Sequence, residues 1–425
     1  MSENNQEIKT LEEVEQVRLR PGVFIPNINY FIYELVDNST DEFLSGYGKK
    51  ITVSINKNKV VTVTDKGRGL PVKPSETYPD KSQAEVAFSS IRSGSKFGTD
   101  GTKSAGMNGV GSSGINFLSE YFNVEIRRNG KIYDMRFEKG KCIEKLHETG
   151  ATTKTDTGTK IVTKPDETIW NKFDDFDIPA IKKRMKQLAY LNPGLTIELK
   201  IDYLDADIDD VYCYENGLDE YIKELLGSEE PLTSIYRIDK SVPIDDNGNT
   251  LDLDIAFAYT EKYYDTVIAF TNNVANTNKR SSHIVGFKTG IASAIKETII
   301  DSELNKSKLE ITNEDTREGI VSVISIKIFN PFFEGQGKDI LNMPIVRSTI
   351  SNAVEEFLLD QFDKNPNEKN IILSRVIDAA RVREATRKTK EATRKVKGLS
   401  GGKVPGLTKA GSNDPSEREI FLVEG

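Results

Sequence analysis

Two side chains with complementary chemistry lie one helical turn apart near the start of the chain. Glu34 and Asn38 fall within residues 30–44, where apolar residues recur every three or four positions and predict an amphipathic helix. Side chains four residues apart in a helix point the same way. A carboxylate can take a proton from water, and a neutral amide oxygen can bind Mg²⁺ beside a triphosphate. Each residue by itself is better explained as a solvated position on a helix.

A second carboxylate, Asp65, ends an expected strand and is followed by Gly67 and Gly69. Glycines at such a place let the backbone turn sharply and approach a ligand closely. A carboxylate accepts hydrogen bonds, so Asp65 could bind the exocyclic amine of adenine, and the Thr159 hydroxyl could support the same edge. The alternatives are a common Asx-type turn for Asp65 and an exposed strand position for Thr159.

Residues 94–114 are dense in glycine, serine and threonine and predict a loop, with a helix beginning at residues 115–120. Backbone N–H groups in such a loop and at the start of a helix favour bound anions. The sequence G-x-x-x-x-G-K-[ST] is absent, which excludes a P-loop. Residues 109–114 match G-x-G-x-x-G, but the polar segment before them does not resemble the strand that a dinucleotide-binding fold requires.

The chain has 425 residues, of which 37% are hydrophobic and 29% charged, so two or three soluble domains are expected. Neither a membrane-spanning apolar run nor a signal peptide is present, and a cytoplasmic location is expected. Cys142 and Cys213 fit incidental thiols in a reducing compartment. Two histidines disfavour a histidine-based metal site. The net charge of −8 excludes a globally basic coat but permits a local basic patch.

The pattern of elements predicts an α+β layer with antiparallel hairpins, and it restarts near residue 214. In the first part we expect helices at 8–20, 30–44, 81–93 and 179–190 and strands at 51–56, 59–64, 122–127, 131–137 and 160–163. In the second part we expect strands at 253–259, 266–271 and 319–329, a helix at 281–299 with a βαβ connection, and a long helical stretch from 348.

Between residues 375 and 397 nine lysines and arginines face three acids. The simplest explanation is a solvated helix, but on an acidic chain this segment favours a partner, and it could follow DNA phosphates without reading base sequence. A linker follows from 398 to about 415, and residues 418–425 look like a strand.

Several motifs, in the same order, resemble those of the ATPase subunits of bacterial type II DNA topoisomerases, the family of gyrase B and topoisomerase IV B. The matching segments are 20–25 (RPGVFI), 34–42 (ELVDNSTDE), 65–71 (DKGRGLP), 107–112 (MNGVGS), 271–273 (TNN) with His283, Gly286 and Phe287, 315–319 (DTREG), 333–338 (FEGQGK) and 421–425 (FLVEG).

The resemblance implies three parts. Residues 1–214 would form a GHKL (Bergerat) ATPase α/β sandwich, and residues 215–395 would form a ribosomal S5-like transducer domain with a long basic C-terminal helix. Residues 396–425 would be a linker and the first strand of a truncated Toprim domain. The D-x-D metal pair of that domain and a cleavage domain are absent, so we expect a fragment that does not cut DNA.

The resemblance also implies roles for individual residues. Glu34 would be the general base, Asn38 the Mg²⁺ ligand, and Asp65 and Thr159 the contacts to adenine. Gln336 and Lys338 would act catalytically, reaching the γ-phosphate from the second domain. The remaining nucleotide-binding positions would be Arg68, Gly69, Pro71, Lys96, Lys103, Gly106, Asn108, Gly109, Val110 and Gly111.

The function that follows is an ATP-hydrolysing gate that dimerises on binding ATP and drives capture and passage of double-stranded DNA. Its cofactors would be ATP and Mg²⁺. Its partners would be DNA, a second copy of the chain and a cleavage protein resembling gyrase A or topoisomerase IV A. The main alternative is a catalytically idle GHKL module that binds ATP and regulates or mimics a topoisomerase. A GHKL chaperone or mismatch-repair clamp would lack the 315–319, 336–338 and 421–425 motifs.

Overall fold

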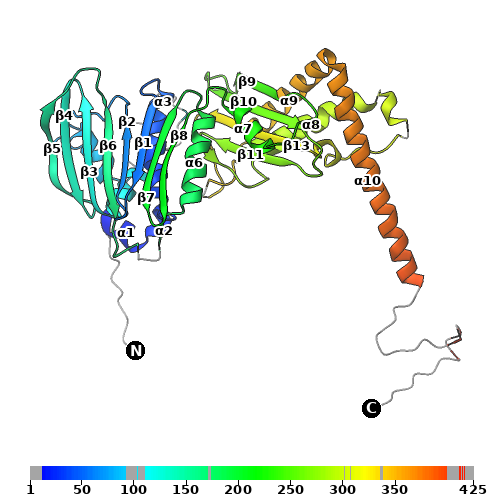
Figure 1. Ribbon diagram of the computed structural model, residues 1–425, viewed down its shortest axis with the longest axis horizontal. Coiled ribbons are helices and arrows are strands. Elements are labelled where there is room, and N and C mark those ends of the chain that lie inside the picture. Colours follow the sequence, from blue (N-terminus) through cyan, green and yellow to red (C-terminus); the bar gives the residue numbers. More distant parts are fainter. Residues whose placement is uncertain are drawn as a thin grey trace.

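The computed structural model describes residues 12–91, 103, 111–170, 174–300, 302–306, 308–335, 338–399, 411, 412, 414 and 416. Two sheets lie on either side of helix α6 (Ile178–Leu191), and the long helix α10 (Pro366–Leu399) projects from the second (Figure 1). Among the described residues, no helix combines the length and the apolar character that a membrane span needs.

The first sheet has eight strands in the order β5-β4-β3-β6-β2-β1-β7-β8. Neighbours pair antiparallel except for β1 and β7, which run parallel. The strands are β1 (Lys50–Ile55), β2 (Val61–Asp65), β3 (Ser119–Arg128), β4 (Lys131–Glu138), β5 (Lys141–Ala151), β6 (Gly158–Pro165), β7 (Thr196–Tyr203) and β8 (Ala206–Tyr212). The helices beside α6 are α1 (Glu13–Leu19), α2 (Pro21–Phe24), α3 (Tyr30–Leu44), α4 (Gln83–Ser89) and α5 (Gly111–Phe117).

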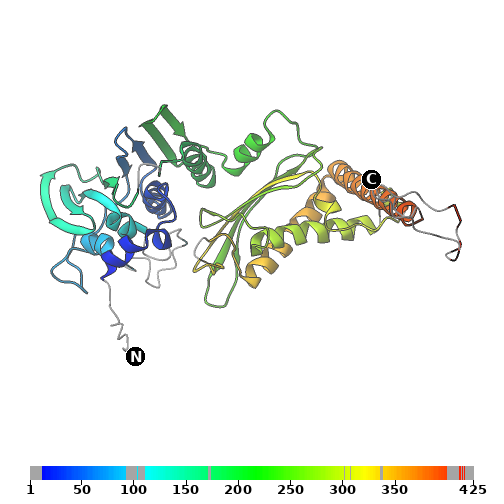
Figure 2. The ribbon, with the colours of Figure 1, turned by 90° about the horizontal axis from the view of Figure 1, so that it is seen from below.

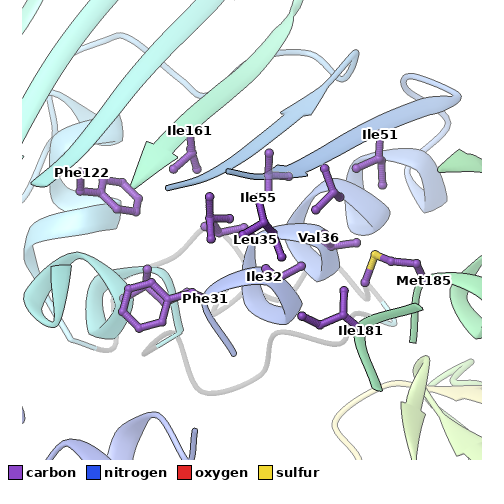
Figure 3. Packing of buried hydrophobic residues seen from close by; sticks show 14 of the residues in the cluster. Phe31, Ile32, Leu35, Val36, Ile51, Ile55, Phe122, Ile161, Ile181 and Met185 are labelled. Atoms are coloured by element: carbon purple, nitrogen blue, oxygen red, sulfur yellow. The ribbon is translucent and has the colours of Figure 1, made fainter. Parts of the chain in front are cut away.

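Helix α3 packs across the middle of this sheet. Its residues Ile32, Leu35 and Val36 are buried against strand residues that include Ile51 and Ile55 (Figure 3). Each side chain buried in this way contributes roughly 1.5–3 kcal/mol. The apolar stripe therefore fixes the rotation of α3 about its axis and turns its polar residues away from the sheet.

The second sheet has the order β12-β11-β13-β10-β9 and is covered on both faces. Helices α8 and α9 cover one face and α7 contributes to the other, which explains why eight of the nine residues of β13 are buried (Figure 2). The elements are α7 (Leu218–Leu226), β9 (Tyr236–Pro243), β10 (Thr250–Tyr259), β11 (Thr266–Thr271), β12 (Val274–Ala275), α8 (Ser282–Ile300), η2 (Glu303–Asn305), η3 (Asp315–Arg317), β13 (Ile320–Ile328) and α9 (Pro344–Lys364).

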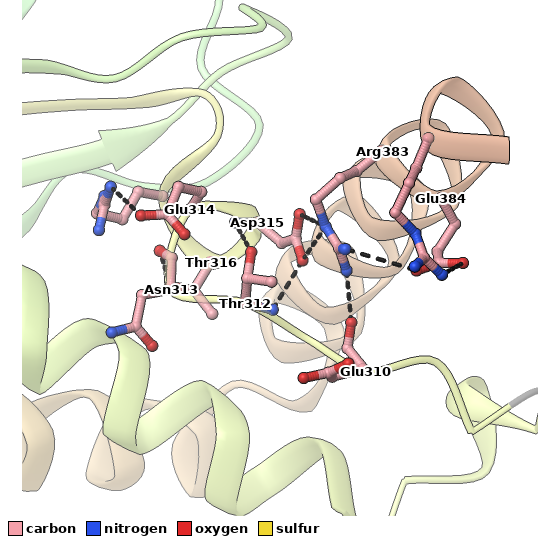
Figure 4. Close-up of polar contacts among 10 residues, drawn as sticks. Glu310, Thr312, Asn313, Glu314, Asp315, Thr316, Arg383 and Glu384 are labelled. Atoms are coloured by element: carbon pink, nitrogen blue, oxygen red, sulfur yellow. Dashed lines mark hydrogen bonds and ion pairs between the residues drawn. The ribbon is translucent and has the colours of Figure 1, made fainter. Parts of the chain in front are cut away.

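The middle of α10 is fixed by ion pairs with the 315–319 motif. Arg383 Nε lies 3.0 Å from the Asp315 carboxylate, and its Nη2 donates to the Glu310 carbonyl at 2.6 Å (Figure 4). Directly after η3, Glu318 lies 3.1 Å from Arg375. Asp315 is only 4% exposed and the Arg383 side chain is 31% exposed, so the pair joins a buried carboxylate to a half-buried guanidinium.

The predicted α+β class is confirmed, and the helix expected at 30–44 has those bounds. The expected βαβ connection is also present, since β11 and β13 are parallel neighbours joined through α8. The helix expected at 115–120 is wrong: α5 begins at Gly111 and ends at Phe117, and β3 follows at once. Its glycine- and serine-rich first turn has weak helix propensity, but Ser113 is fully buried, so tertiary packing decides the conformation.

Candidate functional site

Helix α3 carries the proposed base and metal ligand on the side away from the sheet core. Because Ile32, Leu35 and Val36 point into the core, Glu34 and Asn38 project toward the first turn of α5. Asn38 Nδ2 donates to Ser112 Oγ at 2.7 Å, which assigns the amide oxygen to the other side of the group. The structure therefore brings Glu34 and Asn38 together, as their spacing predicts.

Gly111, the first residue of α5, is in direct contact with Glu34. A Cβ added at position 111 would collide with the Glu34 carboxylate. A side chain at position 111 would therefore have to displace the Glu34 carboxylate, which lies beside the backbone there. Of the nucleotide-binding positions predicted in the glycine-rich loop, Gly111 lies beside Glu34. Four others lie outside the described residues: Gly106, Asn108, Gly109 and Val110.

Asp65 sits at the end of β2 and is 9% exposed. Its Oδ1 accepts from the backbone N–H of Gly67 at 2.8 Å and of Thr159 at 3.3 Å, and Ser39 Oγ donates to Oδ2 at 3.3 Å. Burial raises the pKa of Asp65 to about 6 despite these donors. Thr159 is therefore next to Asp65, as predicted, and its contact with Asp65 is made by its backbone.

The strand β6 approaches Asp65 closely because residue 158 is a glycine. Gly158 has φ +146°, and a Cβ there would overlap the Asp65 carbonyl oxygen. The turn after β2 depends on Gly69 in the same way, since its φ is +73° and a Cβ would lie 2.6 Å from the Arg127 carbonyl oxygen. Two glycines thus let separate backbone segments converge on one buried carboxylate.

Arg68 and Pro71 flank this turn without touching Asp65 in any contact described. Arg68 forms a two-pronged pair with Glu42 at 3.0 and 2.8 Å, and its guanidinium stacks on Tyr47 at 4.4 Å. The Pro71 carbonyl accepts from the Ala84 N–H at 3.1 Å and ties the turn to α4.

Lys103 lies on the second sheet in this structure. Its Nζ is 2.7 Å from both the Asp252 carboxylate and the Thr250 hydroxyl of β10, and its side chain is 18% exposed. A nucleotide-binding role for Lys103 stays a prediction. Lys96 and Gln336 are outside the described residues.

The loop that carries Lys338 is hydrogen-bonded beside the short strand β12. Asn276 Nδ2 donates to the Lys338 carbonyl at 2.7 Å, and Lys338 adopts a left-handed φ of +55°. Burial raises the pKa of the Tyr30 phenol, and the charges of Glu34 and Asp339 raise it further. The charge of Arg184, which also contacts the second half of the chain, lowers the same pKa.

Sequence reasoning missed the polar contacts between the two halves. Arg184 on α6 bonds both to Asp37 on α3 and to the Asn273 carbonyl. One signal for this contact was available in the sequence. Asp37 lies inside the 34–42 motif, between Glu34 and Asn38, and a carboxylate there needs a partner when it is buried.

Some of the basic side chains of α10 are paired with acids of the same chain and are not available to a partner. Arg375 and Arg383, two of the nine basic residues counted there, are paired with acids beside the second sheet. The exposed basic side chains farther along the described helix include Lys388, Lys390 and Arg394.

Family models match both halves of the chain. Residues 26–169 match the histidine kinase-, DNA gyrase B- and HSP90-like ATPases, and residues 217–392 match DNA gyrase B. The first match includes α3, Asp65 and Thr159, and the second includes Asn273 and Lys338. The fold of the first half is therefore the GHKL ATPase fold.

Relatives and solved structures extend over nearly the whole chain. The type 2 topoisomerase B-subunit of Aquifex aeolicus is 37% identical over 98% of this chain and 52% of that protein. The DNA gyrase B protein of Helicobacter pylori is 36% identical, over 98% of this chain and 54% of that protein. The chain thus spans about half the length of these relatives.

Among solved structures, the 43K ATPase domain of Thermus thermophilus gyrase B, in complex with an aminocoumarin, has a TM-score of 0.73. It is 29% identical, covering 89% of this chain and 98% of that one. The topoisomerase IV ATP-binding domain of Francisella tularensis, bound to an inhibitor, has a TM-score of 0.71 at 29% identity, over 87% and 97% of the two chains. The chain belongs to the family of ATPase subunits of bacterial type II DNA topoisomerases, as its motifs predict.

Proposed function

We propose that this chain binds ATP beside α3 and hydrolyses it, and that two copies close around the bound nucleotides as a gate. The observation that carries the proposal is the convergence of four elements. Glu34 and Asn38 on α3 face the first turn of α5, Asp65 ends β2 beside Thr159, and the Lys338 loop is linked to α3 through the turn at Asn273 and Arg184.

Glu34 would accept the proton of the attacking water. Its carboxylate is held against the backbone at Gly111, so the base occupies a defined position. A base that is already positioned loses little entropy when the water is bound.

The residues present fit a bound Mg²⁺. Nδ2 of Asn38 is committed to Ser112, which leaves the neutral oxygen as the ligand atom. Mg²⁺ binds oxygen and is usually held by few protein ligands together with phosphates and water. When bound, the ion would neutralise charge on the phosphates, and Asn38 would orient it.

Asp65 would accept a hydrogen bond from the adenine amine. Its Oδ1 already accepts two backbone N–H groups, so Oδ2, which accepts only from Ser39 in the contacts described, is the oxygen suited to the base. The remaining nucleotide-binding roles, for Arg68, Gly69, Pro71 and Lys103 and for the positions outside the described residues, are part of the same proposal.

Lys338, with Gln336, would bind the γ-phosphate from the second half of the chain. A lysine there can neutralise charge on the transferred group, and its contact would distinguish ATP from ADP. We propose the boundaries given above for the ATPase and transducer parts. In the whole enzyme the gate would capture a DNA duplex, with the exposed basic residues of α10 contacting phosphates and a separate protein cleaving the DNA.

A steady-state ATPase assay with Glu34→Ala tests the proposal. We expect the variant to retain nucleotide binding by calorimetry and to lose about 10²–10⁴-fold in turnover, the usual contribution of a general base. Glu198→Ala is the matched control, because Glu198 pairs with Lys50 on the strands β7 and β1 rather than at the site.

Two results would contradict the proposal. A parent chain that binds ATP but shows no turnover would support the idle-module alternative. Turnover of Glu34→Ala at the parent rate would remove Glu34 from the role of base.

A further inference from the structure

Arg184 is a nearly buried arginine that joins the two halves of the chain through one guanidinium group. Its Nη2 donates to Asp37 Oδ1 at 2.7 Å, and its Nη1 donates to the Asn273 carbonyl oxygen at 2.6 Å. The side chains of Arg184 and Asp37 are 13% and 15% exposed. Charge-assisted hydrogen bonds at this depth are stronger and more directional than surface ion pairs.

One end of this bridge holds the helix that carries the reacting groups. Asp37 lies on α3 between Glu34 and Asn38, one turn after the former and next to the latter. The apolar stripe of α3 fixes the helix against the sheet, while Arg184 restrains the opposite, polar side. A small rotation or slide of α3 would move both Glu34 and Asn38, so this restraint acts on the geometry of the site.

The other end of the bridge is a rigid turn between β11 and β12. Asn272 and Asn273 both adopt positive φ angles, and the Asn272 side chain donates to the Ile328 carbonyl and accepts from the Ile328 N–H, at 2.9 Å each. Asn273 is 1% exposed and Asn276 is 3% exposed. The turn therefore moves as one piece with the second sheet.

The same turn holds the loop of Lys338. Thr271 Oγ1 donates to Asn276 Oδ1 at 2.7 Å, and Asn276 Nδ2 donates to the Lys338 carbonyl at 2.7 Å. The contacts thus run from Asp37 through Arg184 to the turn at Asn273 and on to Lys338. Groups that approach a nucleotide from opposite sides share one polar framework.

We propose that Arg184 is a positioning residue that sets the placement of α3 relative to the Lys338 loop, so that the base and the γ-phosphate contact are aligned together. The inference rests on the proposed function. It predicts that Arg184 affects the rate of hydrolysis and ATP-driven closure much more than the affinity for ADP, because adenine would be held at Asp65, which is fixed mainly by backbone donors of the first sheet's strands and turns.

The test uses Arg184→Gln and Arg184→Lys in the full chain. Glutamine removes the charge and one of the two contacts, whereas lysine keeps the charge but cannot bond two partners in the fork geometry of arginine. Arg237→Gln is the matched control, since the Arg237 side chain is also largely buried, at 24% exposed, and pairs with Asp219 and Asp254, both in the second half.

We expect Arg184→Gln to lower kcat by about 10- to 100-fold, the effect of a misplacement near 1 Å, with the Kd for ADP changed less than about threefold. Dimerisation with a non-hydrolysable ATP analogue, followed by light scattering, should slow in parallel. The kcat of Arg184→Lys should lie between that of the parent and that of Arg184→Gln, and Arg237→Gln should keep the parent kcat. Fluorescence of Trp170, the single tryptophan, verifies that each variant has the parent fold.

Asp37→Asn and the double variant complete a cycle that checks the pair itself. If Asp37 and Arg184 act as one unit, the double variant should be no slower than the slower single variant. A folded Arg184→Gln with the parent kcat, beside an active parent, overturns this inference and leaves the proposed function standing. A parent chain without ATP turnover overturns both. Should Arg184→Gln fail to fold, Arg184→Lys decides between the outcomes.

Discussion

Replacing Asp65 with asparagine should stabilise the nucleotide-free protein at neutral pH while weakening nucleotide binding. The carboxylate is 9% exposed and its pKa is raised from 3.8 to about 6, mainly by burial. At pH 8 the folded protein therefore holds a buried negative charge, and this charge lowers the free energy of unfolding. An amide has a similar shape and carries no charge.

The size of the effect follows from the linkage between protonation and folding. Between about pH 4 and pH 6 the folded state keeps the proton of Asp65 while the unfolded state has lost it, so the parent becomes less stable as the pH rises. Above pH 6 this loss is complete. A pKa raised from 3.8 to about 6 corresponds to an upper limit of about 3 kcal/mol, because one pKa unit is worth about 1.4 kcal/mol.

The hydrogen bonds of the site can accommodate the amide. The asparagine oxygen would keep accepting from Gly67 and Thr159, and its Nδ2 would donate to Ser39 Oγ, which already donates to the Leu35 carbonyl at 3.1 Å. The backbone donors of Gly67 and Thr159 and the Ser39 hydroxyl therefore keep their partners, and one Nδ2 hydrogen is bonded to Ser39.

Urea unfolding followed by the fluorescence of Trp170 measures the change in stability, because Trp170 packs against the same core as α3. Trp170 packs edge-on against Phe31 of α3, with ring centroids 5.8 Å apart. We expect Asp65→Asn to exceed the parent in free energy of unfolding at pH 8. The gap should be larger at pH 8 than at pH 5 by about 1.4 kcal/mol, one pKa unit. Calorimetry should show ADP binding weakened about tenfold or more, since a bond to a charged acceptor is lost.

The reasoning is refuted if the gap in stability is the same at pH 5 and pH 8, or if the variant is less stable at pH 8. Serine at position 39 offers a control: Ser39→Ala removes one donor to Asp65 without changing the charge. Because that hydrogen bond lowers the pKa of Asp65, Ser39→Ala should reduce stability at pH 8 rather than raise it.

The other predictions concern the catalytic side of the site. Gly111→Ala should keep ADP binding and reduce ATP turnover by at least about tenfold, because a methyl group displaces the Glu34 carboxylate; turnover at the parent rate would show that the carboxylate can shift without loss. Lys338→Ala should bind ADP normally yet fail to dimerise with a non-hydrolysable ATP analogue in light scattering, and dimerisation equal to that of the parent would exclude Lys338 as the contact that senses ATP.

The parts of the fold that are predictable from sequence are those with strong local patterns. Helix α3 is predicted at its observed bounds because its apolar residues recur at helical spacing over fifteen residues. The strands β1 and β2 alternate clearly about a turn at Asn56. Strand β5 was missed because its residues are mostly polar and none is fully buried, so the strand lacks a buried face to produce alternation.

The candidate site was predictable as a set of motifs but not as a geometry. Spacing within one helix predicts that Glu34 and Asn38 face the same way, whereas nothing in the sequence shows that Gly111 lies against Glu34. The backbone contact from Thr159 to Asp65 depends on pairing between β2 and β6, which are far apart in the chain. Likewise, the sequence shows Arg375 and Arg383 as part of a basic segment but does not show that each pairs with an acid far from it in the chain.

The ion pairs that anchor the middle of α10 have a mechanical consequence. The helix is 34 residues long, and its last side chain in the apolar core is Ala380, with Arg383 pinned to Asp315 just beyond. Sixteen residues, about 24 Å of helix at 1.5 Å per residue, extend past Arg383, so a tilt of about 10° there would carry the far end through about 4 Å. A small change in the angle of α10 at this ion pair therefore becomes a displacement of several ångströms at its far end.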